Sequence, residues 1–232
     1  MLLFYILDLQ NPVLLSEEES KHCIKVLRLQ KGDSLHLTDG KGHLAKAEII
    51  EANPKKCVLQ ILDIEQFPQK KDFKIHLAVA PTKNADRMEW LVEKCIEIGI
   101  DEISFFQAQH SERQHFNLER LQKKAIAALK QSLHLHLPKM NALLSFKNLI
   151  ANSTEDQKFI AYVDSQNPSK LFESAKKNQS YLVLIGPEGD FSTQELDLAL
   201  NNNFQKVSLG NSRLRTETAG IVACLTLNLL NE

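Results

Sequence analysis

Strand-like and helix-like segments alternate from residue 74 to near the C-terminus, and this alternation most constrains the fold of the chain. The strand-like segments are KIHLAVAP, EISFF, KFIAYV, YLVLIGP and KVSLG. The helical segments are expected over residues 84–98, 117–132, 168–176, 193–201 and 216–230. Strands joined through helices pair in parallel, because each crossover returns the chain to the same end of the sheet. The sequence therefore predicts an α/β domain with a mostly parallel sheet.

The segment 84–98 carries the clearest helical pattern. Its apolar residues recur at helical spacing and are Met88, Leu91, Val92, Cys95 and Ile96. Side chains at this spacing share one face, so the helix should bury that face against the sheet. Gly99 follows directly and is expected to end the helix.

The first seventy residues have a different pattern, in which short strand-like segments are joined by turns. The Asp39–Gly42 stretch, DGKG, predicts a hairpin turn, because glycine readily adopts the positive φ of tight turns. One helix is expected over residues 16–29, with Ser16 as its N-cap. We therefore predict a β-barrel-like domain over residues 1–72 and the α/β domain over residues 73–232.

The charge balance and the cysteines exclude several classes of protein. The net charge is −1, so charge alone does not indicate a nucleic-acid partner, although Lys and Arg exceed Asp and Glu in residues 73–150. The four cysteines contain no C-x-x-C pair, which favours free thiols in a reducing compartment. His134 and His136 lack a third ligand near by, so no metal is expected. The apolar N-terminus is too short to span a membrane, and a cytoplasmic protein is predicted.

Two loops carry the candidate ligand chemistry. The strand YLVLIGP runs into Gly-Pro-Glu-Gly, after which Ser192 and Glu195 form a capping-box pattern. The strand KVSLG runs into a loop with two arginines and no acidic residue, before a helix that Thr216 or Thr218 could cap. Each loop alone is compatible with an ordinary helix entry. Together they favour one shared pocket, because ligands bind at the carboxyl ends of parallel strands. Neither loop has the glycine pattern of a dinucleotide or nucleoside triphosphate site.

The two loops also carry a family resemblance. LIGPEGDFSTQEL and SLGNSRLRTETAGI resemble the corresponding motifs of the RsmE-type branch of the SPOUT methyltransferases. The resemblance extends over nearly the whole chain. It includes KNADRMEWLVEKCIEIGIDEI, Ser111-Glu112-Arg113, Gln131-Ser132, His22, Val26-Leu27-Arg28 and Gly32-Asp33.

The resemblance implies a fold, a reaction and a cofactor. Members of the family use S-adenosylmethionine to methylate N3 of one uridine in the decoding region of 16S ribosomal RNA. They are homodimers with an N-terminal PUA-like, OB-like β-barrel and a C-terminal domain tied in a deep trefoil knot. The cofactor-binding residues carried over to this chain are Leu184, Gly186, Gly189, Leu209, Gly210, Asn211, Leu214 and Thr218.

The chemistry of this reaction leads to hypotheses for the charged residues. Arg213 and Arg215 would hold the uracil oxygens or a flanking phosphate. Glu217 would either take the N3 proton or orient one of these arginines. The residues expected to contact the RNA backbone are Arg28, Arg113, Arg120 and Lys124. With a net charge near zero, the expected substrate is the assembled small ribosomal subunit rather than free RNA.

Some positions depart from the usual family pattern. Asp190 stands where a second glycine is common, and Arg213 where an aliphatic residue is common. Leu133-His134 replaces a common Gly-Arg, and Leu2 and Leu3 stand where an arginine is frequent. Two rival functions remain open: a ribose 2′-O-methyltransferase of the same superfamily, and a non-catalytic RNA-binding assembly factor.

Overall fold

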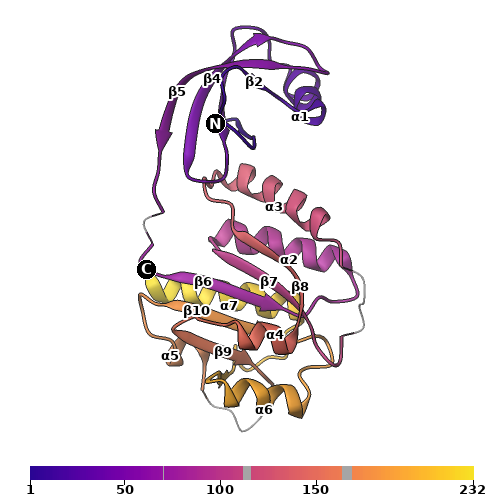
Figure 1. Ribbon diagram of the computed structural model, residues 1–232, viewed down its shortest axis with the longest axis vertical. Coiled ribbons are helices and arrows are strands. Elements are labelled where there is room, and N and C mark those ends of the chain that lie inside the picture. The colour runs from indigo at the N-terminus through magenta and orange to yellow at the C-terminus, as the bar shows by residue number, and fades with distance from the viewer. Residues whose placement is uncertain (70, 112–115, 164–168) are drawn as a thin grey trace. The chain divides into compact units, whose positions relative to one another are not determined.

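A computed structural model describes residues 1–69, 71–111, 116–163 and 169–232 of the chain (Figure 1). The chain forms two compact units. The first contains Met1–Lys70 and Leu129–Leu137, and the second contains Lys71–Ala128 and Pro138–Glu232.

The first unit is a curled five-stranded sheet with the order β1-β3-β4-β5-β2. Its strands are β1 (Leu3–Tyr5), β2 (Val13–Leu14), β3 (Ser34–Thr38), β4 (His43–Glu51) and β5 (Val58–Gln66). β1 pairs in parallel with β3, and the other pairs are antiparallel. β1 and β2 form the two edges of the sheet and are not neighbours in it, so the unit is a half-barrel rather than a closed barrel.

Local signals in the first unit are confirmed in part. Ser16 is the N-cap of α1 (Glu17–Lys21), and its Oγ accepts from the Glu19 N–H at 3.2 Å. The helix expected over residues 16–29 is confirmed at its start but is shorter, because α1 continues directly as a π-helical turn, His22–Val26, and the helical segment ends there. The turn after β3 is confirmed, with φ of +72° at Gly40.

The segment with the two histidines belongs to the first unit through its backbone. The Gly42 N–H donates to the Leu135 carbonyl and the Leu137 N–H to the Gly40 carbonyl, each at 2.8 Å. His136 therefore lies opposite Lys41 in an antiparallel bridge, and this segment extends the edge of the hairpin.

The second unit confirms the α/β prediction. Its sheet contains six strands, all parallel, in the order β11-β9-β10-β6-β7-β8. The strands are β6 (Lys74–Val79), β7 (Glu102–Gln107), β8 (Lys139–Ser145), β9 (Gln157–Ala161), β10 (Ser180–Ile185) and β11 (Gln205–Val207). β10 lies between β6 and β9, with Leu184 opposite both Ala78 and Ile160.

Helices cover both faces of this sheet (Figure 1). The helices of this part of the chain are α2 (Ala85–Ile98), α3 (Leu118–Ser132), α4 (Phe146–Ala151), α5 (Leu171–Ser174), α6 (Thr193–Asn201) and α7 (Thr216–Asn231), and the last residues of α3 belong to the first unit. On one face, α4 and α6 pack over a cluster that includes Ala78, Phe106 and Leu182. On the other face, α7 packs against β6, β10 and α2. The sequence patterns had not predicted β8 or α4.

The packing of α7 requires a small residue at its contact with α2. A Cβ atom at Gly220 would lie 2.6 Å from Leu91 Cδ1 and 3.1 Å from Leu77 Cδ2. The predicted apolar face of α2 is buried, Asn84 caps its start, and Gly99 ends it with a φ of +102°. The two helices therefore lie close together over β6.

All four cysteines are free and buried, as expected. Among the described residues, no helix is both long and apolar enough to cross a bilayer.

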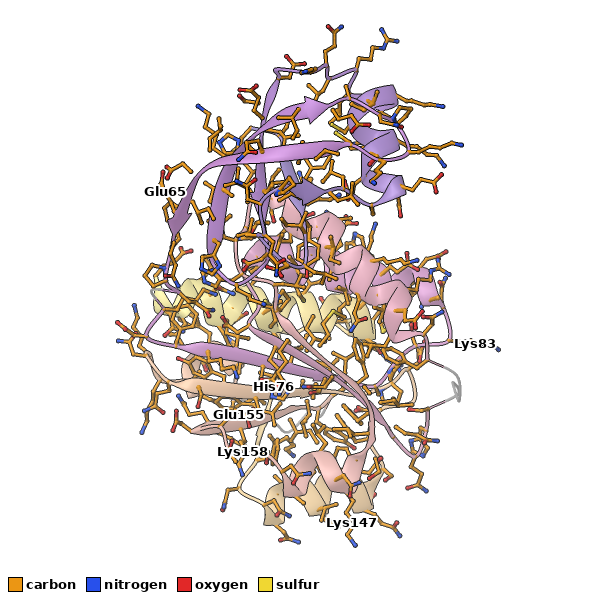
Figure 2. All side chains as sticks on the ribbon, turned by 45° about the horizontal axis from the view of Figure 1, so that its top comes forward. Glu65, His76, Lys83, Lys147, Glu155 and Lys158 are labelled. Carbon is orange, nitrogen blue, oxygen red and sulfur yellow. The ribbon has the colours of Figure 1, made fainter. Side chains whose placement is uncertain are left out.

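A buried polar network joins the strands near their amino ends. Figure 2 shows His76 of β6 beside Glu155, and the His76 Nδ1–H donates to Glu155 Oε1 at 2.5 Å. His76 Nε2 lies 2.7 Å from Ser104 Oγ of β7, which also accepts from Asn141 Nδ2 of β8. Asn141 Nδ2 also donates to Glu102 Oε1 at 2.7 Å. These bonds satisfy polar groups that would otherwise be costly to bury.

The low pKa of the Glu102 carboxylate predicts that the protein loses stability in acid. Burial acts to raise the pKa of Glu102, but hydrogen bonds from Lys74, Lys139 and Asn141 outweigh burial and lower the pKa to about 2. The ionised form therefore stabilises the fold above the unfolded pKa of about 4.3, and this contribution of up to about 3 kcal/mol is lost as the pH falls toward 2.

Glu102→Gln should lower the free energy of unfolding at pH 7 and reduce its loss between pH 5 and pH 2. Urea unfolding at several pH values measures both effects. Glu173→Gln is the matched control, because Glu173 pairs with Lys170 on the surface. Parallel pH profiles for Glu102→Gln and the unmodified protein would contradict the prediction.

Candidate functional site

The two loops that follow β10 and β11 are joined by a hydrogen bond. The Thr216 hydroxyl donates to the carbonyl of Gly186 at 3.0 Å, although the two residues are 30 positions apart. The expected capping role of Thr216 or Thr218 is wrong. Arg215 is the N-cap residue of α7, and its side chain makes no capping bond. The Thr216 side chain bonds to the loop after β10 instead, so a hydrogen bond joins the two loops.

The capping box expected in the loop after β10 is confirmed. Ser192 caps α6 with the full capping box, in which its Oγ accepts from the Glu195 N–H and Glu195 Oε2 accepts from the Ser192 N–H. A second oxygen of Glu195 accepts from the Gln109 N–H at 2.8 Å. The loop after β10 therefore enters a firmly fixed helix.

The eight predicted cofactor-binding residues lie on or beside these loops. Leu184 is buried at the end of β10. Four are half-buried: Gly186, Leu209, Leu214 and Thr218. Three are exposed: Gly189, Gly210 and Asn211. The loops thus combine accessible backbone groups with half-buried leucines, and their roles toward a cofactor stay predictions.

Space is open beside the second loop. Gly210 has a φ of +134°, which favours glycine, and a Cβ built on it would meet no atom of the described structure within 4 Å. The Gly210 N–H donates to Ser208 Oγ at 3.2 Å, and the Ser208 hydroxyl donates to the Gly210 carbonyl at 2.9 Å. A ligand could therefore approach this backbone closely.

Asp190 occupies a conformation that explains why glycine is common at this position. Its φ is +61°, in the left-handed region that only Gly, Asn and Asp tolerate well. Burial raises the pKa of its carboxyl, against the opposing effects of the Phe191 N–H bonded to it and of the Arg213 guanidinium. Arg213, in the loop after β11, therefore interacts electrostatically with Asp190 in the loop after β10.

Glu217 is the buried acid of the site. It is 5% exposed, and its Oε1 lies 3.7 Å from Arg87 Nε. Its Oε2 is buried and has no hydrogen-bond partner among the described residues. The expected alternative, pairing with Arg213 or Arg215, is not what the structure shows: both arginines are exposed, and the cation beside Glu217 is Arg87.

Arg87 was not singled out from the sequence. It lies in the first turn of α2 and lines a cavity of about 340 Å³ with Lys83, Asn84 and Glu188. Glu188 belongs to the Gly-Pro-Glu-Gly loop, so this cavity adjoins the loop after β10. The signal that could have found Arg87 was its place within KNADRMEW, a segment that carries the family resemblance.

The predicted RNA-binding cations lie in different surroundings. Arg120 pairs with Asp86 at 3.1 Å and with Glu89, and Lys124 pairs with Glu93, so both link α3 to α2. Arg28 is exposed and has a φ of +59°. Arg113 lies outside the described residues. RNA contact by these four residues stays a prediction.

Comparisons with known proteins match both units. Residues 69–228 match the family described as an RNA methyltransferase domain, and residues 15–62 match the RNA methyltransferase PUA domain. The Ribosomal RNA small subunit methyltransferase E of Buchnera aphidicola is 30% identical, over 97% of this chain and 90% of its own length.

Solved structures agree over the whole length. A probable rRNA-methyltransferase from Porphyromonas gingivalis has a TM-score of 0.93 and 41% identity, covering 100% of this chain and 98% of its own. A methyltransferase from Legionella pneumophila, solved in complex with the bound cofactor SAM, has a TM-score of 0.90 and 25% identity, covering 99% and 98%.

Removing the Thr216 hydroxyl should loosen the joined loops. Thr216→Val keeps the size of the side chain but deprives the Gly186 carbonyl of this donor, and should lower the free energy of unfolding by about 1–2 kcal/mol. Thr216→Ser keeps the hydroxyl and should cost less. Urea unfolding measures both variants. Equal destabilisation by serine and valine would show that the methyl group, not the hydrogen bond, matters here.

Proposed function

This chain belongs to the RsmE family of RNA methyltransferases with an N-terminal PUA domain, and we propose that it methylates N3 of one uridine in the decoding region of 16S ribosomal RNA. The family match, which extends over nearly the full length of the chain, carries this proposal. It is supported by the relative from Buchnera aphidicola, which is named for the small-subunit ribosomal RNA.

The methyl donor is S-adenosylmethionine, as the bound cofactor of the similar Legionella protein supports. The residues of the two loops fit such a group. Open space beside Gly210 and exposed backbone at Gly189 suit polar contacts, while the half-buried Leu209 and Leu214 suit the apolar face of an adenine. The remaining residues of the proposed cofactor site are Leu184, Gly186, Asn211 and Thr218. When bound, the cofactor supplies a methyl group from its sulfonium sulfur, and the sulfur is left as a neutral thioether.

The reaction requires that a residue of the chain remove the N3 proton of uracil. Uracil N3 carries hydrogen and is a poor nucleophile until that proton leaves. Glu217 Oε2 is an acceptor that is buried without a donor, and a ligand N–H placed there would satisfy it. Glu217 takes the N3 proton, and the lone pair left on N3 forms the bond to the methyl carbon. The proton then passes to water.

Arg213 and Arg215 act on the RNA. Both are exposed and lie directly before α7, so their guanidinium groups are available to phosphate oxygens. Their closeness in sequence to Glu217 supports a role near the reacting base. Arg28, Arg113, Arg120 and Lys124 extend the contact to the RNA backbone, although Arg120 and Lys124 would do so while paired with acids.

The substrate is the assembled small subunit, because a chain of net charge −1 has little general attraction for free RNA. The protein would therefore work in the cytoplasm, where that subunit is built.

A homodimer and a trefoil knot complete the proposal. Leu225 and Leu229 lie one turn apart on α7 and are 42% and 55% exposed, and Trp90 on the adjacent α2 is 45% exposed. Exposed apolar side chains on neighbouring helices suit a subunit interface. The knot rests on the family resemblance. It is compatible with β11 at the sheet edge and α7 returning beneath β6 and β10.

Arg215→Ala should abolish methyl transfer and leave cofactor affinity nearly unchanged, because Arg215 acts on the RNA. Transfer of radiolabelled methyl groups to small subunits from a strain lacking the enzyme measures the first effect, and calorimetry with S-adenosylmethionine the second. If cofactor affinity collapsed in parallel, Arg215 would belong to the cofactor site.

Leu229→Glu should convert the dimer to a monomer, since a charge would be buried at the interface. Light scattering coupled to size-exclusion chromatography measures the mass. Leu200→Glu is the matched control, because Leu200 is likewise an exposed leucine, at 42%, but lies on α6. A Leu229→Glu protein that stays dimeric would place the interface elsewhere.

A further inference from the structure

A second cavity lies within the first unit of the chain. Its volume is about 440 Å³, which is within the range of small-molecule pockets. It is lined by residues 7–9 after β1, by Asp39, Lys41 and His43 of the β3–β4 hairpin, and by Ile64 of β5. All of these residues belong to the first unit.

Leu7 is an apolar side chain at this cavity that is open to solvent. It is 80% exposed. The segment that carries it is nevertheless fixed at both ends. The Ile6 N–H donates to the Thr38 carbonyl at 2.9 Å, and Asn11 Oδ1 accepts from the Ile61 N–H at 3.1 Å. Leu7 therefore lies on a segment that β3 and β5 both hold in place.

Ile64 and the half-buried Leu9 extend the apolar part of the lining. Ile64 is 45% exposed. It lies opposite Ala45 in the β4–β5 pairing, and His43 is two residues before Ala45. Since alternate residues of a strand point to the same face, Ile64 and His43 share one face of the sheet. The cavity thus combines an exposed apolar wall, of the kind that marks binding sites, with a histidine beside it.

The Asp39–His43 pair supplies a polar group to the cavity. Asp39 is only 9% exposed, and its carboxylate accepts from the Lys41 N–H and from the His43 Nδ1–H, each at 2.8 Å. Burial acts to raise the pKa of Asp39, but these hydrogen bonds outweigh burial and lower the pKa, so the carboxylate is ionised. The bond fixes the ring of His43 and leaves Nε2 as its second polar atom. No hydrogen bond joins Nε2 to another residue in the part of the chain that the structure describes.

The lining favours a flat, partly apolar ligand over a free anion. Asp8 and Asp39 bring two carboxylates to the cavity, against the single cation Lys41, so a free phosphate would be repelled. A nucleobase has apolar faces and an edge that carries N–H donors. Its faces suit the leucines and the isoleucine, and its donors suit the acceptors Asp8 and His43 Nε2. Proteins commonly bind single-stranded RNA through unstacked bases that are held and hydrogen-bonded in this way.

We propose that this cavity binds one unpaired base of the ribosomal RNA, other than the target uridine. The proposal rests on the proposed function, and the match of this unit to the PUA domain of RNA methyltransferases supports RNA as its ligand. The base lies against Leu7, Leu9 and Ile64. Its edge donates hydrogen bonds to His43 Nε2 and to the Asp8 carboxylate.

The contact with a base supplies affinity that charge does not. Lys and Arg do not outnumber Asp and Glu in residues 1–69, so the unit has little general attraction for phosphates. Lys41 is exposed and forms no ion pair with a described residue, and its amino group is available to the phosphate of the bound nucleotide. Because only an unpaired base can enter the cavity, the contact also favours RNA in which that base is exposed.

Ultraviolet cross-linking of the intact protein to small subunits from a strain lacking the enzyme tests the proposal. Irradiation joins a base to the side chains that it contacts, and mass spectrometry of the digested complex identifies the peptide and the nucleotide. An RNA adduct is expected within residues 7–9, at His43 or at Ile64. Absence of an adduct from all of these positions overturns the proposal.

Leu7→Asp should weaken binding to small subunits about tenfold, the size of losing contact with one base. It should also remove the adduct and leave kcat at saturating subunits within a factor of about two, because the contact is uniform binding. Leu14→Asp is the matched control. It adds the same charge at an exposed leucine of the same unit, outside the cavity, and should leave the affinity and the adduct unchanged.

Leu7→Ala carries the test if Leu7→Asp does not fold. It removes only apolar contact and should weaken binding about threefold. Unchanged affinity in Leu7→Asp, or in Leu7→Ala where only that variant folds, overturns the base site. Weakened affinity with adducts only elsewhere in the chain also overturns it, and assigns the cavity to a ribosomal protein.

Failure of the proposed function gives a different result. A protein that does not methylate uridine N3 would overturn that function. The adduct and the affinity for subunits are measured without methyl transfer, so they decide the base site independently.

Discussion

The parallel pairing of β6, β10, β9 and β11 is the constraint on which the site depends. Since these strands run in one direction, the segments that follow β6, β10 and β11 begin at the same end of the sheet, whatever their distance along the chain. The Thr216–Gly186 hydrogen bond then joins two of these segments, and the start of α2 adds a third. A buried carboxylate, a partly exposed guanidinium and two glycine-containing loops are brought together by the topology of the backbone.

The sequence predicted the parts of this arrangement that are local. The bounds of α2 and α6 follow from the spacing of their apolar residues and from their capping residues. Both signals involve residues within about one helical turn of each other, so they can be read from the sequence. α4 was missed because it is short, and β8 because it is largely exposed on a sheet edge, where no clear apolar pattern is required. The π-helical turn after α1 was missed because its residues suit an α-helix equally well.

The tertiary contacts of the site could not be predicted from local patterns. A threonine at a helix start is normally a cap, and nothing near Thr216 reveals that its hydroxyl reaches Gly186. The arginines nearest to Glu217 in sequence are not its partners, because the ion pair is made with Arg87, 130 positions earlier. The family resemblance indicated the two loops, and the geometry identified Arg87 as the neighbour of Glu217.

The central claim is that these groups direct a methyl group to N3 of a single uridine. Mass spectrometry of 16S ribosomal RNA from a strain without this gene tests it most directly. The account predicts that one N3-methyluridine in the decoding region is lost and is restored by the unmodified gene. Loss of a ribose methyl group instead, or an unchanged pattern of methylation, would contradict it.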